Sequence, residues 1–330
     1  MGSKVTIRDL AKACDVSTAL VSKALKGKPG VEASRRDFII KTAKELGYDF
    51  DMLRGRDIQR ISAYLLEDHD LAFALPFFGS VLAGIDEECK NHSIAFSFST
   101  LSQKADINKA IFESNSQAAV FLGFFPAAMR EQISSSSYPC AMVDGYAPNV
   151  ICFNVNNFAL SYEITCHLIK QGAKRLAFLV PLKDHYSVGE RERGFLQALY
   201  DHDLPLDPNY QLSSSALGRK SHEIDQDVEY LFSLKNKPDA IVTYNDQLAL
   251  QVMKSCSRLG IRIPDDVLLT GFDGTDICQY LSPSLTSANI DGKLMGQSAA
   301  KALIDKLTPS NYELKGTIML RQSSSRTKLN

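Results

Sequence analysis

Apolar residues in the first fifty positions recur every three or four residues, as in short amphipathic helices. Thr6 and Ser17 are residue types that favour a helix N-terminus, and Gly47 is of the type that ends one. The tight turn before Ser17 gives this segment the pattern of a helix-turn-helix unit, although any small three-helix cap would share it. The predicted helices cover residues 7–13, 18–25 and 34–46.

From Ile61 onward, short apolar runs alternate with amphipathic stretches. Such alternation predicts parallel sheets with helices on both faces. Because 270 residues are many for one sheet, two doubly wound parallel-sheet subdomains are expected. The predicted strands are 61–66, 94–98, 118–122, 140–143, 176–180, 240–243 and 267–271. The predicted helices between them include 78–91, 158–171, 190–202, 224–233 and 247–259.

A charged, weakly apolar stretch that contains Gly55 separates the two patterns. We therefore predict a small all-α head and an α/β body joined by a linker. The predicted bounds are 1–49 for the head, 50–60 for the hinge linker and 61–330 for the body.

The composition is that of an ordinary globular protein, with 45% hydrophobic and 23% charged residues. No run approaches the roughly 20 apolar residues of a membrane helix, and the N-terminus is too polar for a signal peptide. Seven scattered cysteines without a CxxC pair indicate reduced thiols. A cytoplasmic protein without a metal site or a membrane partner is expected.

The net charge of −1 hides an uneven distribution. Residues 1–60 carry 13 Lys and Arg against 8 Asp and Glu, a balance of +5, so the rest carries −6. A basic head on an acidic body is expected where only the head meets a polyanion such as DNA.

The head carries four ordered motifs: T-I-x-D-L-A at 6–11, V-S-x-x-x-V-S-x-x-L at 16–25, G-K-x-G-V at 27–31 and E-L-G-Y at 45–48. In these motifs the segment resembles the head of the lactose-repressor/galactose-repressor family of bacterial transcription regulators. The resemblance implies that double-stranded operator DNA is a partner.

The resemblance continues through the body, where five shorter motifs follow in the family's order. It implies a periplasmic-binding-protein type I fold with a ligand cleft between two subdomains. The expected subdomains are about 61–157 with 289–317, and about 158–288 with 318–330. The motifs are Val155-Asn156-Asn157, Arg191-x-x-Gly194-Phe195, Asn245-Asp246, Gly271-Phe272-Asp273 and Arg321-x-Ser323-Ser324.

The resemblance places Thr18, Ala19 and Lys23 on the side of the second helix that faces the DNA groove. Lys23 stands where the family often has Arg; it can donate to guanine O6 or N7, but it lacks the planar fork. Ala19 can touch a thymine methyl group. The further DNA-contacting residues expected are Thr6, Ser17, Ser22, Lys28 and Arg54.

The linker departs from the family pattern. The family inserts a hinge leucine into the minor groove nine residues after the tyrosine that matches Tyr48, whereas Asp57 stands there in this chain. Leu53 or Ile58 could supply the apolar wedge instead, so kinking of the minor groove stays an open alternative.

Arg191, Asn245 and Asp273 follow the carboxyl ends of predicted strands, where parallel sheets bind ligands. A guanidinium, an amide and a carboxylate together suit a polyhydroxylated ring. Each also has a structural interpretation, as a surface ion pair for Arg191 and a cap or turn for the other two. Asn156 replaces the family's aspartate, and Phe77 belongs either to the pocket wall or to the core.

No phosphate-binding glycine loop, HExxH or GxSxG motif is present, so an enzyme is not favoured and no cofactor is expected. The sequence favours a ligand-responsive regulator, preferably a repressor, that binds a near-palindromic operator as a homodimer and is nucleoid-associated when bound. A sugar-like or related metabolite is the expected effector. The alternatives are a solute-binding protein or a ligand-independent regulator with the same body.

Overall fold

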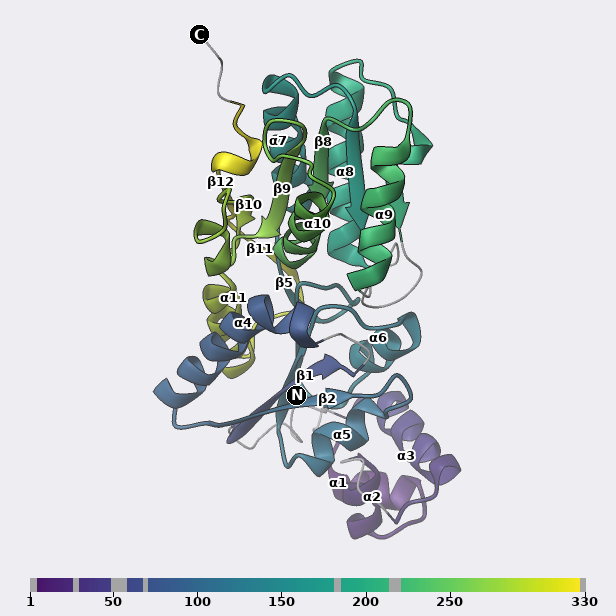
Figure 1. The fold of residues 1–330 in the computed structure, drawn as a ribbon. Helices are drawn as coiled ribbons and strands as arrows, with labels where there is room; N and C mark the ends of the chain where they lie inside the picture. The colour runs from purple at the N-terminus through teal and green to yellow at the C-terminus, as the bar shows by residue number, and fades with distance from the viewer. Residues whose placement is uncertain are drawn as a thin grey trace.

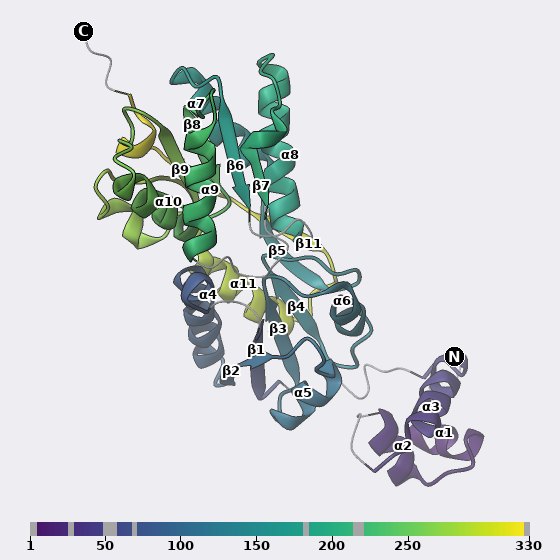
Figure 2. The same cartoon turned by 45° about the vertical axis from the view of Figure 1, so that its right-hand side comes forward.

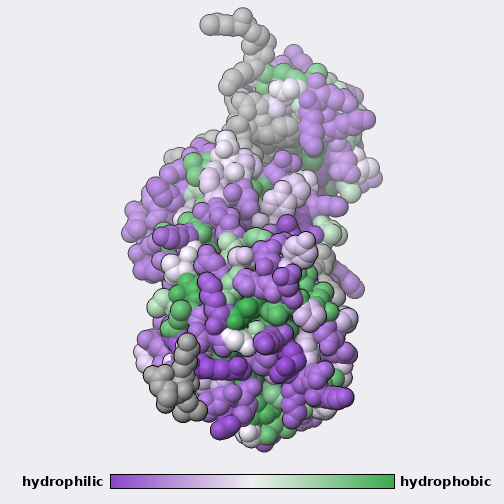
Figure 3. Space-filling view, turned by 90° about the horizontal axis from the view of Figure 1, so that it is seen from above, coloured by the Kyte–Doolittle hydropathy of each residue, from purple (hydrophilic) through white to green (hydrophobic). Residues whose placement is uncertain are grey.

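The computed structural model describes residues 5–25, 30–48, 58–67, 71–180, 185–213 and 221–326. A three-helix head lies beside one end of an elongated α/β body that contains two sheets (Figures 1 and 2). No helix in these ranges is both long and apolar enough to span a bilayer. On the face shown in Figure 3, hydrophilic residues predominate and apolar side chains form small groups between them.

The head folds around a small apolar core to which all three helices contribute, with Leu10, Val21 and Ile39 fully buried. Gly47 ends the third helix with a φ of +69°, a conformation that glycine adopts without strain. The helix-turn-helix prediction is confirmed in its elements. They are α1 (Ile7–Ala13), α2 (Thr18–Leu25) and α3 (Ala33–Glu45).

The first unit of the body is a parallel sheet in the order β11-β5-β4-β3-β1-β2. Alternate residues of its strands face opposite layers, with α4 and α11 on one side and α5 and α6 on the other. The strands are β1 (Arg60–Leu66), β2 (Ala95–Leu101), β3 (Ala118–Leu122), β4 (Cys140–Val143), β5 (Ile151–Val155) and β11 (Asn311–Leu314). The helices are α4 (Leu71–Asn91), α5 (Ile107–Glu113), α6 (Ala127–Ser134) and α11 (Gly292–Ile304).

The second unit is a sheet in the order β12-β10-β9-β8-β6-β7, in which only β12 runs antiparallel among the described strands. Helices α7 and α8 cover one face, and α9 and α10 cover the other. The strands are β6 (Leu176–Val180), β7 (Gln211–Ser213), β8 (Ala240–Thr243), β9 (Leu268–Asp273), β10 (Thr286–Asn289) and β12 (Thr317–Met319). The helices are α7 (Asn157–Lys170), α8 (Tyr186–Asp201), α9 (Ser221–Ser233) and α10 (Asp246–Arg258), with short 3-10 turns η2 (Pro208–Tyr210), η3 (Asp276–Gln279) and η4 (Gln322–Ser324).

The chain crosses between the two units three times, from β5 to α7, from β10 to α11 and from β11 to β12. The last crossing occurs because β11 pairs with β5 in the first sheet and β12 with β10 in the second. Because the three connections are short and neighbouring, they hold the two units together but allow one unit to rotate relative to the other. This is the geometry of a hinge.

Close helix packing in each unit depends on glycine. A Cβ at Gly296 of α11 would overlap the carbonyl oxygen of Val81 in α4, and a Cβ at Gly194 of α8 would overlap that of Phe158 in α7. The glycine of the R-x-x-G motif therefore lets α8 lie directly on α7.

The structure corrects several predicted element bounds. Helix α8 begins at Tyr186, so Arg191 lies in its second turn rather than near its start. Strand β9 extends to Asp273, which is its last residue rather than a residue after it. Helix α4 begins well before residue 78 and contains Pro76. Strands β5, β7, β10, β11 and β12 and helices α5, α6 and α11 were not predicted.

Candidate functional site

Helix α2 has one buried face and one polar exposed face. Val21, Ala24 and Leu25 pack into the head core, whereas Thr18, Ala19 and Lys23 are exposed and Ser22 is half-buried. The side chains predicted to face DNA therefore lie on the solvent side of the helix. Lys28 and Arg54 lie outside the described residues.

Two other predicted DNA-contacting residues also cap helices. The Thr6 hydroxyl donates to Oδ2 of Asp9 at 2.6 Å, and the backbone N–H of Asp9 donates back to the Thr6 hydroxyl at 3.3 Å. The hydrogen bonds that the Thr6 hydroxyl and the Thr6 backbone N–H donate to the carboxylate lower the pKa of Asp9. Ser17 accepts from the N–H of Leu20 at 3.2 Å, so it fixes the start of α2.

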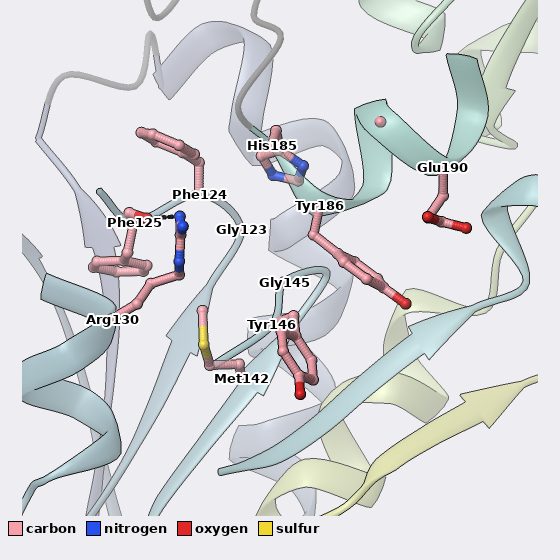
Figure 4. A pocket seen from close by; sticks show the side chains of 11 residues that line it. Gly123, Phe124, Phe125, Arg130, Met142, Gly145, Tyr146, His185, Tyr186 and Glu190 are labelled. Carbon is pink, nitrogen blue, oxygen red and sulfur yellow. Dashed lines mark hydrogen bonds between the residues drawn. The ribbon is translucent and has the colours of Figure 1, made fainter. Parts of the chain in front are cut away.

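A cavity of about 300 Å³ lies between the two units of the body. One side is formed by α6 and by the segments that follow β3 and β4, and the other by the first turns of α8 (Figure 4). Since the walls come from both units, a bound molecule would contact both. The cavity is lined by Gly123, Phe124, Phe125, Arg130, Met142, Gly145, Tyr146, His185, Tyr186, Gly189 and Glu190.

Two stacked aromatic pairs join the walls of this cavity. Phe124 of the first unit stacks on His185 of the second, with ring centroids 6.0 Å apart and planes 28° apart. Tyr146 of the first unit stacks on Tyr186 of the second, with ring centroids 5.7 Å apart and planes 28° apart. Each pair therefore joins one residue from each unit, and opening the cleft would separate both.

Arg191 lies beside the cavity and is almost fully buried. Its Nε donates to Oδ1 of Asn157 at 2.8 Å, and its Nη1 donates to the carbonyl oxygen of Tyr244. The guanidinium carbon lies 3.7 Å from the ring centroid of Phe272. The side chain is thus held at once by α7, by the residue that follows β8 and by β9.

Two carboxylates compensate the charge of Arg191. Asp273 lies 3.7 Å from it within the second unit, and Asp144 lies 3.9 Å from it across the cleft. Asp144 also accepts a hydrogen bond from Ser187 of α8. Burial raises the pKa of Asp273 well above its usual range; the charge of Arg191 lowers it, and nearby carboxylates add to the rise.

Of the five predicted effector residues, the structure brings only Arg191 and Asp273 together beside the cavity. Asn245 caps α10 by accepting a hydrogen bond from its first turn at 2.9 Å. Asn156 caps α7 and donates to Glu313 at 3.2 Å, and so ties two of the crossing segments together. Phe77 packs in the core of the first unit and does not line the cavity.

The sequence analysis missed Arg130, Asp144 and the aromatic lining. Part of the signal was available, because residues 123–125 follow β3 and residues 144–146 follow β4, both correctly predicted strands. Ligand sites lie at such carboxyl ends. Arg130 has no comparable signal, since it is one charged residue on an amphipathic helix.

Residues 165–324 match the model of a family described as a periplasmic binding protein-like domain. The chain is 25% identical over 311 residues to the NTD biosynthesis operon regulator NtdR of Bacillus subtilis (strain 168), covering 92% of this chain and 93% of that protein. It is 26% identical over 312 residues to the HTH-type transcriptional repressor CytR of Escherichia coli (strain K12), covering 92% of this chain and 89% of that protein. These relatives are transcription regulators rather than enzymes.

Solved structures show the same fold. The transcriptional regulator CelR in complex with cellobiose superimposes with a TM-score of 0.71 at 20% identity, covering 97% of this chain and 100% of that one. The lac repressor dimer bound to operator and the anti-inducer ONPF superimposes with a TM-score of 0.69 at 18% identity. The match covers 98% of this chain and 100% of that one. Over head and body alike the chain is thus similar to bacterial transcription regulators, and its fold is that of the lac repressor, in line with the resemblance to the lactose-repressor/galactose-repressor family.

Proposed function

We propose that this regulator is a repressor that acts as a homodimer on a near-palindromic operator in the cytoplasm, associated with the nucleoid when bound, and that it has no enzymatic activity. The observation that carries the proposal is the combination of an exposed polar face on α2 with a cavity whose walls come from two hinged units. The head supplies a contact surface for DNA, and the cavity supplies a control site.

DNA recognition is assigned to α2. The ammonium group of Lys23 would donate to guanine O6 or N7, and Thr18 and Ala19 would contact base edges or a thymine methyl group. Ser17, Ser22 and Thr6 would contact phosphates through their hydroxyl groups, with further contacts from Lys28 and Arg54. Two heads related by a two-fold axis would enter major grooves roughly 34–36 Å apart.

Control is assigned to the cavity between the units. A small metabolite held between α6 and α8 would favour one relative arrangement of the units, to the extent that it binds that arrangement more tightly. The three crossing segments turn this difference into a rotation, which the linker passes to the head. Arg191 and Asp273 would hold the second-unit wall in position beside the ligand.

A DNA selection experiment tests the proposal. The full-length protein is incubated with fragmented genomic DNA in excess competitor polynucleotide, and the captured fragments are sequenced. We expect enrichment of fragments with an inverted repeat. Lys23→Ala should lose this enrichment, whereas Lys41→Ala, which removes an exposed lysine from α3, should retain it. Capture without preference for any fragment would refute the proposal.

A further inference from the structure

Arg130 supplies a positive charge to the wall of the cavity. Arg130 projects from α6 and is half-buried, and its Nη1 donates to the carbonyl oxygen of Phe125 at 2.7 Å (Figure 4). Within the part of the chain that the structure describes, it forms no ion pair. The other N–H groups of its guanidinium remain to bind a ligand.

The other charged groups near the cavity are already compensated. Glu190 accepts a hydrogen bond from Arg193 Nη1 at 2.7 Å, so its charge is paired within α8. Arg191 is held between Asp144 and Asp273. The uncompensated charge that faces the cavity among the described residues is therefore positive, and it favours an anionic ligand.

The geometry of a guanidinium narrows the ligand chemistry further. Its planar fork matches two oxygens of a carboxylate or phosphate group. The stacked pairs Phe124–His185 and Tyr146–Tyr186 bring aromatic rings to the cavity from both of its walls. Such walls suit a flat or ring-shaped body rather than a flexible chain.

We propose that the effector is a small ring compound that carries an oxyanion group, and that Arg130 binds this group while the ring contacts the aromatic walls. The inference rests on the proposed role of the cavity as the effector site. It replaces the polyhydroxylated ring expected from Arg191 and Asp273, because Arg191 already donates to Asn157 and Tyr244, and neither Arg191 nor Asp273 is among the residues that line the cavity.

Calorimetric titration of the full-length protein with two matched pairs of probes tests this inference. The pairs are benzoate with benzamide, and glucose 6-phosphate with glucose. In at least one pair the anionic member should bind roughly ten- to a hundredfold more tightly, as expected for hydrogen bonds to charged groups. Arg130→Gln should abolish that difference, and Arg130→Lys should restore part of it.

Arg262→Gln is the matched control, because it removes an exposed arginine whose partner, Asp266, is far from the cavity in the fold. It should bind both pairs as the unchanged protein does. Equal binding within both pairs, binding by neither pair, or a preference for the anion that survives in Arg130→Gln would each overturn the inference. The operator selection described above does not depend on Arg130, so its result decides separately whether the chain is a regulator at all.

Discussion

Replacing Arg191 by methionine should destabilise the body more than any other single change near the cavity. The two side chains are similar in volume, although methionine is shorter, so the substitution removes charge and donors while keeping an apolar stem. It leaves the buried Asp273 without its cation and leaves Oδ1 of Asn157 and the carbonyl oxygen of Tyr244 without a donor. Breaking a buried pair from one side costs about 3–5 kcal/mol, a large part of the roughly 5–15 kcal/mol of a typical domain.

The loss of stability in Arg191→Met should depend on pH, because protonation of Asp273 removes the buried negative charge that has lost its cation. Its pKa is raised in the folded chain, whereas in the unfolded chain it lies near 3.9. Between these values the folded chain binds more protons, so the free energy of unfolding falls as pH rises. Arg191→Met removes the positive charge that lowers the pKa of Asp273. The pH range in which the folded chain binds the extra proton therefore extends to higher pH. The variant should come closest to the unchanged protein at low pH.

Urea unfolding at pH 5 and pH 8 measures both effects. Because the chain has no tryptophan, circular dichroism is the appropriate signal. Adding Asp273→Asn to Arg191→Met should recover part of the stability, since it removes the orphaned charge. A variant that loses less than about 0.5 kcal/mol at both pH values, as ordinary surface substitutions do, would show that Arg191 does not hold the surrounding elements together.

Three further changes test the head and the helix packing. Lys23→Ala should reduce discrimination between operator and random DNA by about 1–3 kcal/mol, measured by fluorescence anisotropy, and equal losses on both DNAs would mean that Lys23 contacts only phosphates. Gly194→Ala should destabilise the body by about 1–3 kcal/mol in thermal unfolding, because the new methyl group overlaps the carbonyl oxygen of Phe158, and an unchanged melting temperature would contradict this close approach. Thr6→Ala should cost the head about 0.5–2 kcal/mol of stability in urea unfolding through loss of its capping box, whereas Thr6→Ser should retain most of it.

Elements with strong local signals were predicted well. The uninterrupted apolar runs of β3, β4, β6 and β8 match their predicted bounds, because both faces of a parallel strand are buried. The head helices follow from their caps. In contrast, α8 was placed too late because it begins with Tyr-Ser-Val-Gly and its cap is His185, an uncommon capping residue.

Elements that depend on distant partners were missed. Strand β5 contains Asn154, which is buried only because its amide donates to the carbonyl oxygen of Gly145 and to Asn311 of β11. Helix α11 is rich in small residues, which become useful only against the matching glycine of α4. No local pattern reports such contacts.

The candidate site was predicted in part for the same reason. The rule that ligands meet the carboxyl ends of parallel strands located Asp273 and its neighbour Arg191. The rule also selected Asn245, and the family resemblance selected Asn156, but both residues cap helices. The sequence does not distinguish a capping amide from a ligand-binding amide, because both roles place the same side chain at the same turn.

The return of α11 and β11 to the first unit sets an order for folding during synthesis. The head needs only residues up to about position 48, whereas the first sheet lacks an edge strand and an outer helix until residues 292–314 have emerged. At typical translation rates this gap lasts on the order of tens of seconds. During that time the nascent protein would possess a finished reading head and no working sensor, so metabolite control begins only after residues 292–314 have left the ribosome.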